Sequence, residues 1–196
     1  KRELGKIGEG LKEISNTFTS ALKWNTAYGA INAMSSSLKD AVHFAKELDR
    51  TLTDIRIVAG LTKDEAIAFG EEATKLAQRL GSTTSEYTKA SLIYFQQGLD
   101  TSQVKEMTDA TVMAANITGE SARDMSDYLT AVVNGYGMVA DEAMSVVDKL
   151  AAVGAATASD FGELSVGMSK VASMAKTAGV PIEKLAAQLS TIMSTT

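Results

Sequence analysis

The chain has 196 residues, of which 45% are hydrophobic and 22% charged, so it can bury a core and is not globally disordered. It contains no cysteine, which excludes disulfides, thiolate zinc sites and cysteine nucleophiles, and its single proline favours a chain that is helical nearly throughout. The net charge is -5, and the seventeen acidic and ten basic groups beyond residue 60 leave that part without the basic face that nucleic acid binding requires. We therefore expect no sequence-specific nucleic acid binding. The first residue is Lys rather than Met, so we expect a fragment of a longer protein.

Residues 1–58 are predicted to form one long coiled-coil-like helix. Apolar or small residues recur there at steps that alternate between three and four, which is the spacing of a heptad seam. The seam consists of Trp24, Ala27, Ile31, Met34, Leu38, Ala41, Ala45, Leu48, Leu52 and Ile55. A second seam of different phase precedes it, from Leu4 to Ala21. Such a length of seam needs a partner, which is either a second copy of the chain or the helices that follow, and we expect a homo-oligomer.

The stretch Trp24–Leu38 carries no charged residue, which leaves two interpretations open. Asparagine, threonine and serine residues interrupt it, so we interpret it as a weakly polar part of the helix, with an interfacial membrane segment as the alternative. No run approaches the roughly 18 apolar residues of a membrane-spanning helix. The single histidine, His43, falls on the helix face opposite the seam, and we interpret it as a solvated residue.

Residues 59–196 are predicted to form a helical core domain, a cluster of short amphipathic helices separated by glycine-containing joints. Thr62 with Glu65, and Thr83 with Glu86, fit capping boxes in which each side chain bonds the other residue's free backbone N–H. Several glycines stand where a helix would end in a left-handed residue. The joint residues are Gly60, Thr62, Gly81, Thr83, Gly98, Asp100, Gly119, Gly179 and Pro181.

Three further joint features are expected in this domain. Ser159 is a plausible N-cap, Pro181 fits a first helical turn, and Gly135-Tyr136-Gly137 is interpreted as a turn. Eight of the nine methionines lie beyond Ser102. Because methionine adapts to irregular gaps, we interpret them as helix-packing residues, with a promiscuous binding surface as the alternative.

Residues that carry chemistry are nearly absent. His43 has no second histidine or cysteine to complete a transition-metal site. The adjacent acids Glu71-Glu72 and Asp141-Glu142 lie near expected helix starts, where they favour the helix dipole, and we prefer that interpretation to a catalytic pair. No phosphate-binding glycine loop is present. We therefore expect no enzyme, and no catalytic, cofactor-binding or metal-binding residues.

The order and spacing of the joints carry a resemblance to a known family. The helix Phe44–Asp49 runs into Val58–Thr62, and further matching segments follow at Leu80–Glu86, Gln97–Asp100, Ala114–Gly119, Val133–Gly137, Ala140–Asp141, Asp148–Leu150, Ala155–Phe161 and Ala178–Glu183. Together they resemble the core region of the tail tape measure proteins of tailed bacteriophages, over roughly Leu38 to Met193. One departure is the joint near Ala156, which reads Ala-Ala-Thr-Ala-Ser where the family has a more polar sequence.

This resemblance implies an all-α structural protein of the virion. Tape measure proteins are long, mostly helical chains inside the tail tube, whose length sets tail length because tube rings polymerise around them. The implied partners are the tail tube protein, tail tip or baseplate proteins, tail assembly chaperones and, at infection, the host envelope. The resemblance favours a trimer. It also implies a position in the tail lumen near the tip, a period in the host cytoplasm during assembly, and expulsion ahead of the DNA.

Two alternatives from other classes stay open on the sequence. A membrane-active helical protein, such as a pore-former or an injected effector, would use the charge-free stretch and the methionine-rich helices. A coiled-coil adaptor would use the seam as a dimerisation arm and the helical cluster as a peptide groove.

Overall fold

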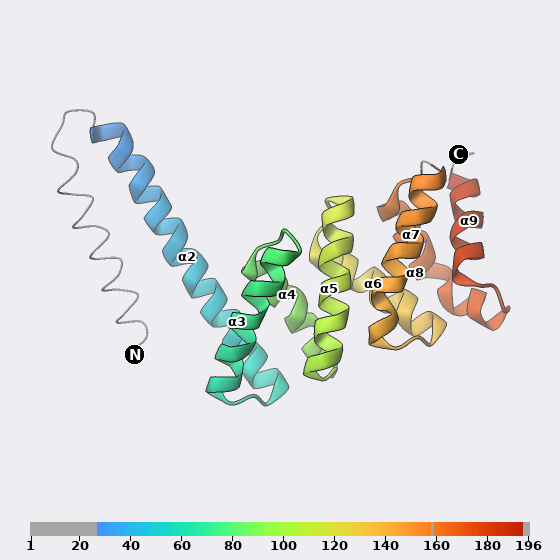
Figure 1. Ribbon diagram of the computed structural model, residues 1–196, viewed down its shortest axis with the longest axis horizontal. Coiled ribbons are helices and arrows are strands. Elements are labelled where there is room, and N and C mark those ends of the chain that lie inside the picture. The colour runs from blue at the N-terminus through green and yellow to red at the C-terminus, as the bar shows by residue number, and fades with distance from the viewer. Residues whose placement is uncertain (1–26, 158, 194–196) are drawn as a thin grey trace. The chain divides into compact units, whose positions relative to one another are not determined.

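The computed structural model describes residues 27–157 and 159–193, with side chains from Val42 onward. Within these ranges there are eight α-helices, one 3₁₀ turn and no strand, so the predicted all-α class is confirmed (Figure 1). The bounds are α2 Ala27–Ala59, α3 Lys63–Arg79, α4 Thr84–Gln96, α5 Thr101–Thr118, α6 Ala122–Tyr136, η1 Ala140–Glu142, α7 Ala143–Thr157, α8 Phe161–Thr177 and α9 Ile182–Met193.

The chain divides into two compact units, Lys1–Ala45 and Lys46–Thr196. Helix α2 has 33 residues, and its last turns belong to the second unit. Trp24 and the earlier seam between Leu4 and Ala21 lie outside the described residues. The division into domains 1–58 and 59–196 stays a prediction.

The helix joints of the second unit repeat one backbone arrangement. A glycine with φ between 65° and 83° occupies the left-handed region at Gly60, Gly81, Gly98, Gly119, Gly137 and Gly179. After five of them, the next residue donates its N–H to a carbonyl five positions back, as in Leu61 to Arg56 at 3.0 Å. This is a Schellman motif, which gives hydrogen-bond donors to carbonyl groups that the end of the helix leaves without a partner. At four of these joints the donor is apolar and packs against the main core: Leu61, Leu99, Met138 and Val180.

At four joints the residue two positions after the glycine caps the start of the next helix with its side chain. The capping boxes expected at Thr62 and Thr83 are present: Thr62 N donates to Glu65 Oε2 at 2.7 Å, and Glu65 N donates to Thr62 Oγ1 at 3.3 Å. Asp100 forms a third box with Gln103. Three residues are therefore enough to end one helix and begin the next.

Four local expectations differ from the structure. The acidic pair Glu71-Glu72 lies in the middle of α3 and not near a helix start. Gly135 lies inside α6 and is not part of a turn, because the helix continues to Tyr136. The N-cap of α8 is Asp160, whereas the expected cap, Ser159, bonds Ser190 through their hydroxyls at 2.6 Å. Pro181 precedes α9 instead of lying within its first turn.

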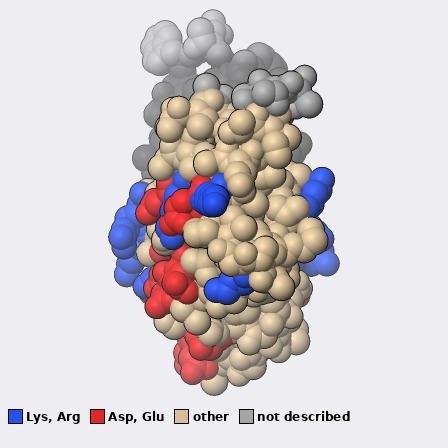
Figure 2. All heavy atoms as spheres, turned by 90° about the vertical axis from the view of Figure 1, so that its right-hand side faces the viewer, with Lys and Arg blue, Asp and Glu red and all other residues tan. Residues whose placement is uncertain are grey.

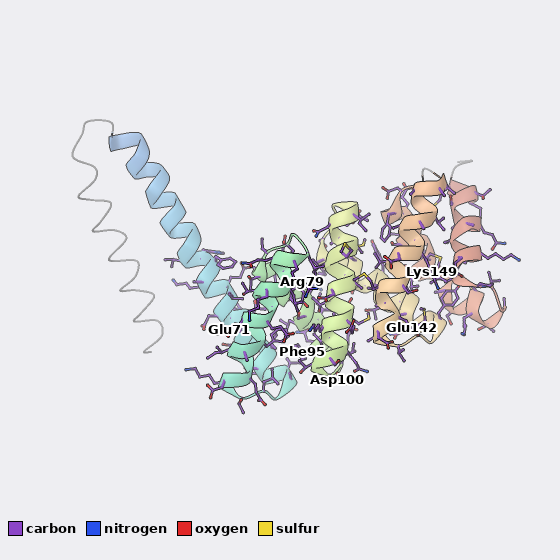
Figure 3. The ribbon with its side chains drawn as sticks, viewed as in Figure 1. Glu71, Arg79, Phe95, Asp100, Glu142 and Lys149 are labelled. Atoms are coloured by element: carbon purple, nitrogen blue, oxygen red, sulfur yellow. The ribbon has the colours of Figure 1, made fainter. Side chains whose placement is uncertain are left out.

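The core of the second unit is one apolar cluster that runs from the end of α2 to α9, with a smaller cluster between α3, α4 and α5. Helices α6 and α8 pack closely at Gly135, where an added Cβ would lie only 2.7 Å from Ala172 Cβ. Near the other end, Phe95 of α4 meets Phe69 of α3 edge to face at 5.5 Å between ring centroids (Figure 3). The second unit is thus tightly packed between α6 and α8.

Candidate interaction surfaces

The last two residues of the heptad seam pack within their own chain. Ile55 is fully buried in the main core, and Leu52 packs so closely on α3 that a Cβ on Gly70 would lie 2.9 Å from Leu52 Cδ1. Ala45, by contrast, is exposed and Leu48 is half-buried. Side chains of earlier seam residues lie outside what the structure describes. Any seam between copies therefore ends before Leu52.

The predicted joint residues serve the backbone. A Cβ added at any of the six positive-φ glycines would have no atom within 4 Å apart from those of its two chain neighbours. Backbone conformation, and not packing, therefore requires glycine at these positions. Thr62, Thr83 and Asp100 use their side chains as caps. The structure distributes these residues along the array and does not bring them together in one site.

The acidic pairs also have structural partners. Glu72 forms an ion pair with Lys105 at 2.8 Å, and Glu142 accepts a hydrogen bond from the backbone N–H of Val139 at 2.9 Å. Among the described residues no cluster of three or more His, Cys, Asp or Glu side chains is placed to hold a metal ion. Nor does the described part of the chain contain a helix that is both long and apolar enough to cross a bilayer.

The interface between α4 and α5 carries a row of side-chain hydrogen bonds that the sequence analysis did not find. Tyr87 donates to Asp109 at 2.6 Å, Thr108 donates to Ser91 at 3.2 Å, and the hydroxyls of Tyr94 and Thr111 meet at 2.5 Å. All of these residues are buried except Asp109. A signal was present in the sequence, because Ser91, Thr108 and Thr111 stand on helix faces that are otherwise apolar.

Three more polar contacts extend this row to its neighbours. Lys105 of α5 pairs with Glu72 of α3, Asn116 of α5 donates to the carbonyl of Leu80, and Gln97 exchanges hydrogen bonds with Thr130 of α6 at 3.5 and 3.4 Å. We call these six contacts the polar ladder. It links α3 and α4 on one side to α5 and α6 on the other.

Burial raises the pKa values of the two tyrosines of the ladder above their ordinary value of about 10. Burial, with a smaller contribution from the hydrogen bond to Asp109, raises the pKa of Tyr87. Burial also raises the pKa of Tyr94 to about 12. Both hydroxyls therefore stay neutral near pH 7, and no buried side-chain polar atom of the described residues lacks a hydrogen-bond partner.

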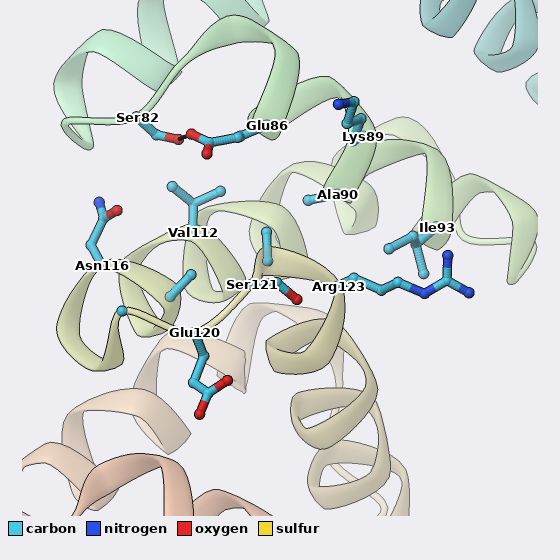
Figure 4. Close-up of a pocket in the computed structure, with 13 residues that line it drawn as sticks. Ser82, Glu86, Lys89, Ala90, Ile93, Val112, Asn116, Glu120, Ser121 and Arg123 are labelled. Atoms are coloured by element: carbon cyan, nitrogen blue, oxygen red, sulfur yellow. Dashed lines mark hydrogen bonds between the residues drawn. The ribbon is translucent and has the colours of Figure 1, made fainter.

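A groove of about 480 Å³ opens beside the ladder, between α4, α5 and the start of α6 (Figure 4). Its walls are mostly apolar and built from small or branched side chains, namely Ala90, Ile93, Val112, Ala115 and Ala122. Charged and polar side chains stand around it, with Glu86 and Lys89 from α4 and Glu120 and Arg123 near the start of α6. The surfaces of α4 and α5 are thus not fully packed against each other on this side.

The end of the array formed by α8 and α9 has a different character. Figure 2, which views this end, shows charged side chains gathered in groups and a broad surface without them. Met174 and Ile192 are 66% and 60% exposed. Lys149 of α7 pairs with Glu183, in the first turn of α9, at 2.9 Å.

These features are those of a helical scaffold: side-chain caps at the helix joints, the polar ladder, an open groove and exposed apolar side chains on α8 and α9. The model of the phage-related minor tail protein family matches residues 70–196, more than half of the chain, and the chain belongs to that family. A curated relative, the probable tape measure protein of Escherichia phage P2, is 24% identical over 139 residues, which cover 70% of this chain and 17% of that protein. The chain thus spans less than a fifth of that relative's length. No solved structure matches.

The predicted resemblance to phage tail tape measure proteins is therefore confirmed. As a phage tail protein, the chain is virion-associated.

Proposed function

We propose that this chain is part of a structural, non-catalytic tape measure protein that sets tail length as a helical ruler. The observation that supports this most directly is the continuous 33-residue helix α2, which runs into a unit of the phage minor tail family. A continuous helix rises about 1.5 Å per residue, so α2 spans roughly 50 Å and converts residue number into distance.

The helical cluster has a different role in this proposal. Its helices reverse direction at joints of three or four residues, so its length does not follow its residue number, and it is unsuited to measuring. We assign it to anchoring, in the tail lumen near the tip, with tail tip or baseplate proteins as partners. Tail tube protein would surround the rod, and tail assembly chaperones would hold the chain in the host cytoplasm during assembly.

In this proposal, the exposed part of the heptad seam forms contacts between copies of the chain. Ala45 is exposed and Leu48 half-buried, while the adjacent Val42 and Phe44 are each 42% exposed. These apolar positions suit a homo-oligomer of parallel rods, of which a trimer is the form that the family resemblance favours. Ejection ahead of the DNA, with contact to the host envelope, completes the proposed role.

Tail length measured by electron microscopy tests the ruler. In the full-length gene, the three heptads Trp24–Phe44 are duplicated in one variant and deleted in another, which leaves the docked positions Leu52 and Ile55 untouched. At about 1.5 Å per residue, the tails should lengthen or shorten by roughly 32 Å, or by the nearest whole tube ring. Assembled tails of unchanged length in both variants would refute a measuring role for this helix.

A further inference from the structure

The polar ladder and the groove lie at the same boundary within the second unit. On one side of it stand α3 and α4, and on the other stand α5 to α9. All six contacts of the polar ladder cross this boundary, and the groove opens along it between α4, α5 and α6. Two independent features, polar contacts and incomplete packing, therefore coincide at one plane.

The last turns of α2 are attached to α4 and α3 on their side of this plane. Glu47 of α2 pairs with Lys89 of α4 at 2.6 Å, and Leu52 packs against Gly70 of α3. The covalent link across the plane is the α4–α5 joint, where Gly98 has a φ of 83° and open space around it. Such a glycine joint can absorb a change in backbone angle without steric conflict.

The packing beyond the plane is of another kind. Leu164 and Met168 of α8 are fully buried, and α6 meets α8 so closely at Gly135 that there is no room for a Cβ. Separating α6 from α8 exposes apolar surface to water. Separating α4 from α5 also exposes apolar side chains, Tyr94, Phe95 and Val112 among them, but part of the surface it exposes is hydroxyl groups, which exchange their partners for water at small net cost.

We infer that α3 and α4, with the attached end of α2, form a flap that separates from α5–α9 as a unit, about the Gly98 joint. The closed flap is the stable state, because Tyr94 and Phe95 belong to the main core and hold it in place. The open flap is a minor state in which the ladder residues are hydrated. This inference concerns the isolated chain and does not depend on the ruler proposed above.

Native-state hydrogen exchange on the full chain, followed by mass spectrometry, measures the opening. Amides of α3 and α4 should exchange together, with protection at least tenfold lower than that of α6 and α8. Equal protection in all four helices would mean that only global unfolding exposes them, and would overturn the inference.

An engineered disulfide tests whether the plane between α4 and α5 is the one that opens. The chain has no native cysteine, and the hydroxyls of Ser91 and Thr108 are 3.2 Å apart, so the double variant S91C/T108C places two thiols across the plane. Its reduced form carries the same two substitutions without the cross-link and is the reference; it should keep the wild-type protection of α6 and α8, which controls for folding. Its oxidised form should raise the protection of α3 and α4 at least tenfold.

The matched control locks two elements that lie on the same side of the plane. Ser159 and Ser190 are 2.6 Å apart through their hydroxyls, so S159C/S190C joins the segment before α8 to α9. Its oxidation should leave the protection of α3 and α4 unchanged. If the control lock protects α3 and α4 as strongly as S91C/T108C does, the gain is global, and the flap is refuted. No gain on oxidising S91C/T108C would refute it equally.

Discussion

Replacing Gly135 with alanine should destabilise the fold by forcing α6 away from α8. The new Cβ would lie 2.7 Å from Ala172 Cβ and 3.0 Å from the backbone nitrogen of Ser173. Carbon atoms in contact prefer about 3.5–4.0 Å, so the helices must separate by roughly 1 Å. Neither obstructing atom lies at the end of a flexible side chain, so rotamer changes do not relieve the clash.

The magnitude follows from two opposing effects. Overpacking a close-packed interface costs about 1–3 kcal/mol, while replacing a helical glycine with alanine gains at most about 1 kcal/mol. Because the clash is with backbone, we expect a value near the upper end and a net loss of about 2 kcal/mol. For a unit of this size that loss lowers Tm by roughly 4–8 °C, measurable by circular dichroism.

Gly167→Ala provides the matched control. It is also a helical glycine, in α8, and its added Cβ would lie 3.0 Å from Met193 Cε and 3.3 Å from Leu189 Cδ1. Both atoms are ends of flexible side chains that can rotate aside, so this variant should be as stable as the wild type or gain up to about 1 kcal/mol. A Gly135→Ala variant with a Tm equal to or above that of Gly167→Ala would refute the close-packing argument.

Three further outcomes are expected. Ile55→Ala should lose about 2–5 kcal/mol in chemical denaturation because Ile55 is fully buried, whereas Ile57→Ala, at a position 68% exposed, should stay within about 0.5 kcal/mol of the wild type. Asp100→Ala should cost about 1 kcal/mol through loss of the α5 cap, with Asp100→Asn retaining most of it; equal loss in both would contradict the capping role. The backbone N–H of Thr83 lowers the pKa of Glu86 from 4.5, so its stabilisation is present above pH 4.5 and disappears as the pH falls through the lower folded value. Melting curves of wild type and Glu86→Gln should therefore differ at pH 7 and converge in acid, and a gap that persists in acid would contradict this.

The local structure of the joints could be predicted from sequence because its causes lie within a few residues. Thr62 and Glu65 bond each other's backbone whatever surrounds them, and the same holds at Thr83. The predicted cap was wrong where two neighbouring residues could each cap the same helix. Ser159 and Asp160 are both good caps, and only tertiary contact with Ser190 decides which one caps α8.

Features that depend on the partner of a helix face could not be predicted in the same way. Glycine at 135 is used for close helix packing and glycine at 137 for a turn, although the sequence presents them as one motif. The heptad seam has a constant period up to Ile55, yet that period does not say that its last residues pack within the chain. Predicting the polar ladder requires knowing which helices face each other, and the spacing of residues along one helix does not give that information.

The repeated joint has a consequence for how related chains can vary in length. Positive-φ glycines follow one another at intervals of 21, 17, 21 and 18 residues, at Gly60, Gly81, Gly98, Gly119 and Gly137. Each interval contains one helix with both of its ends closed by its own joints. Removing part of an interval separates a cap from its helix. Removing a whole interval takes out one helix and leaves an intact joint between the helices that flanked it. Natural insertions and deletions in this unit are therefore expected in steps of about 20 residues, one helix at a time.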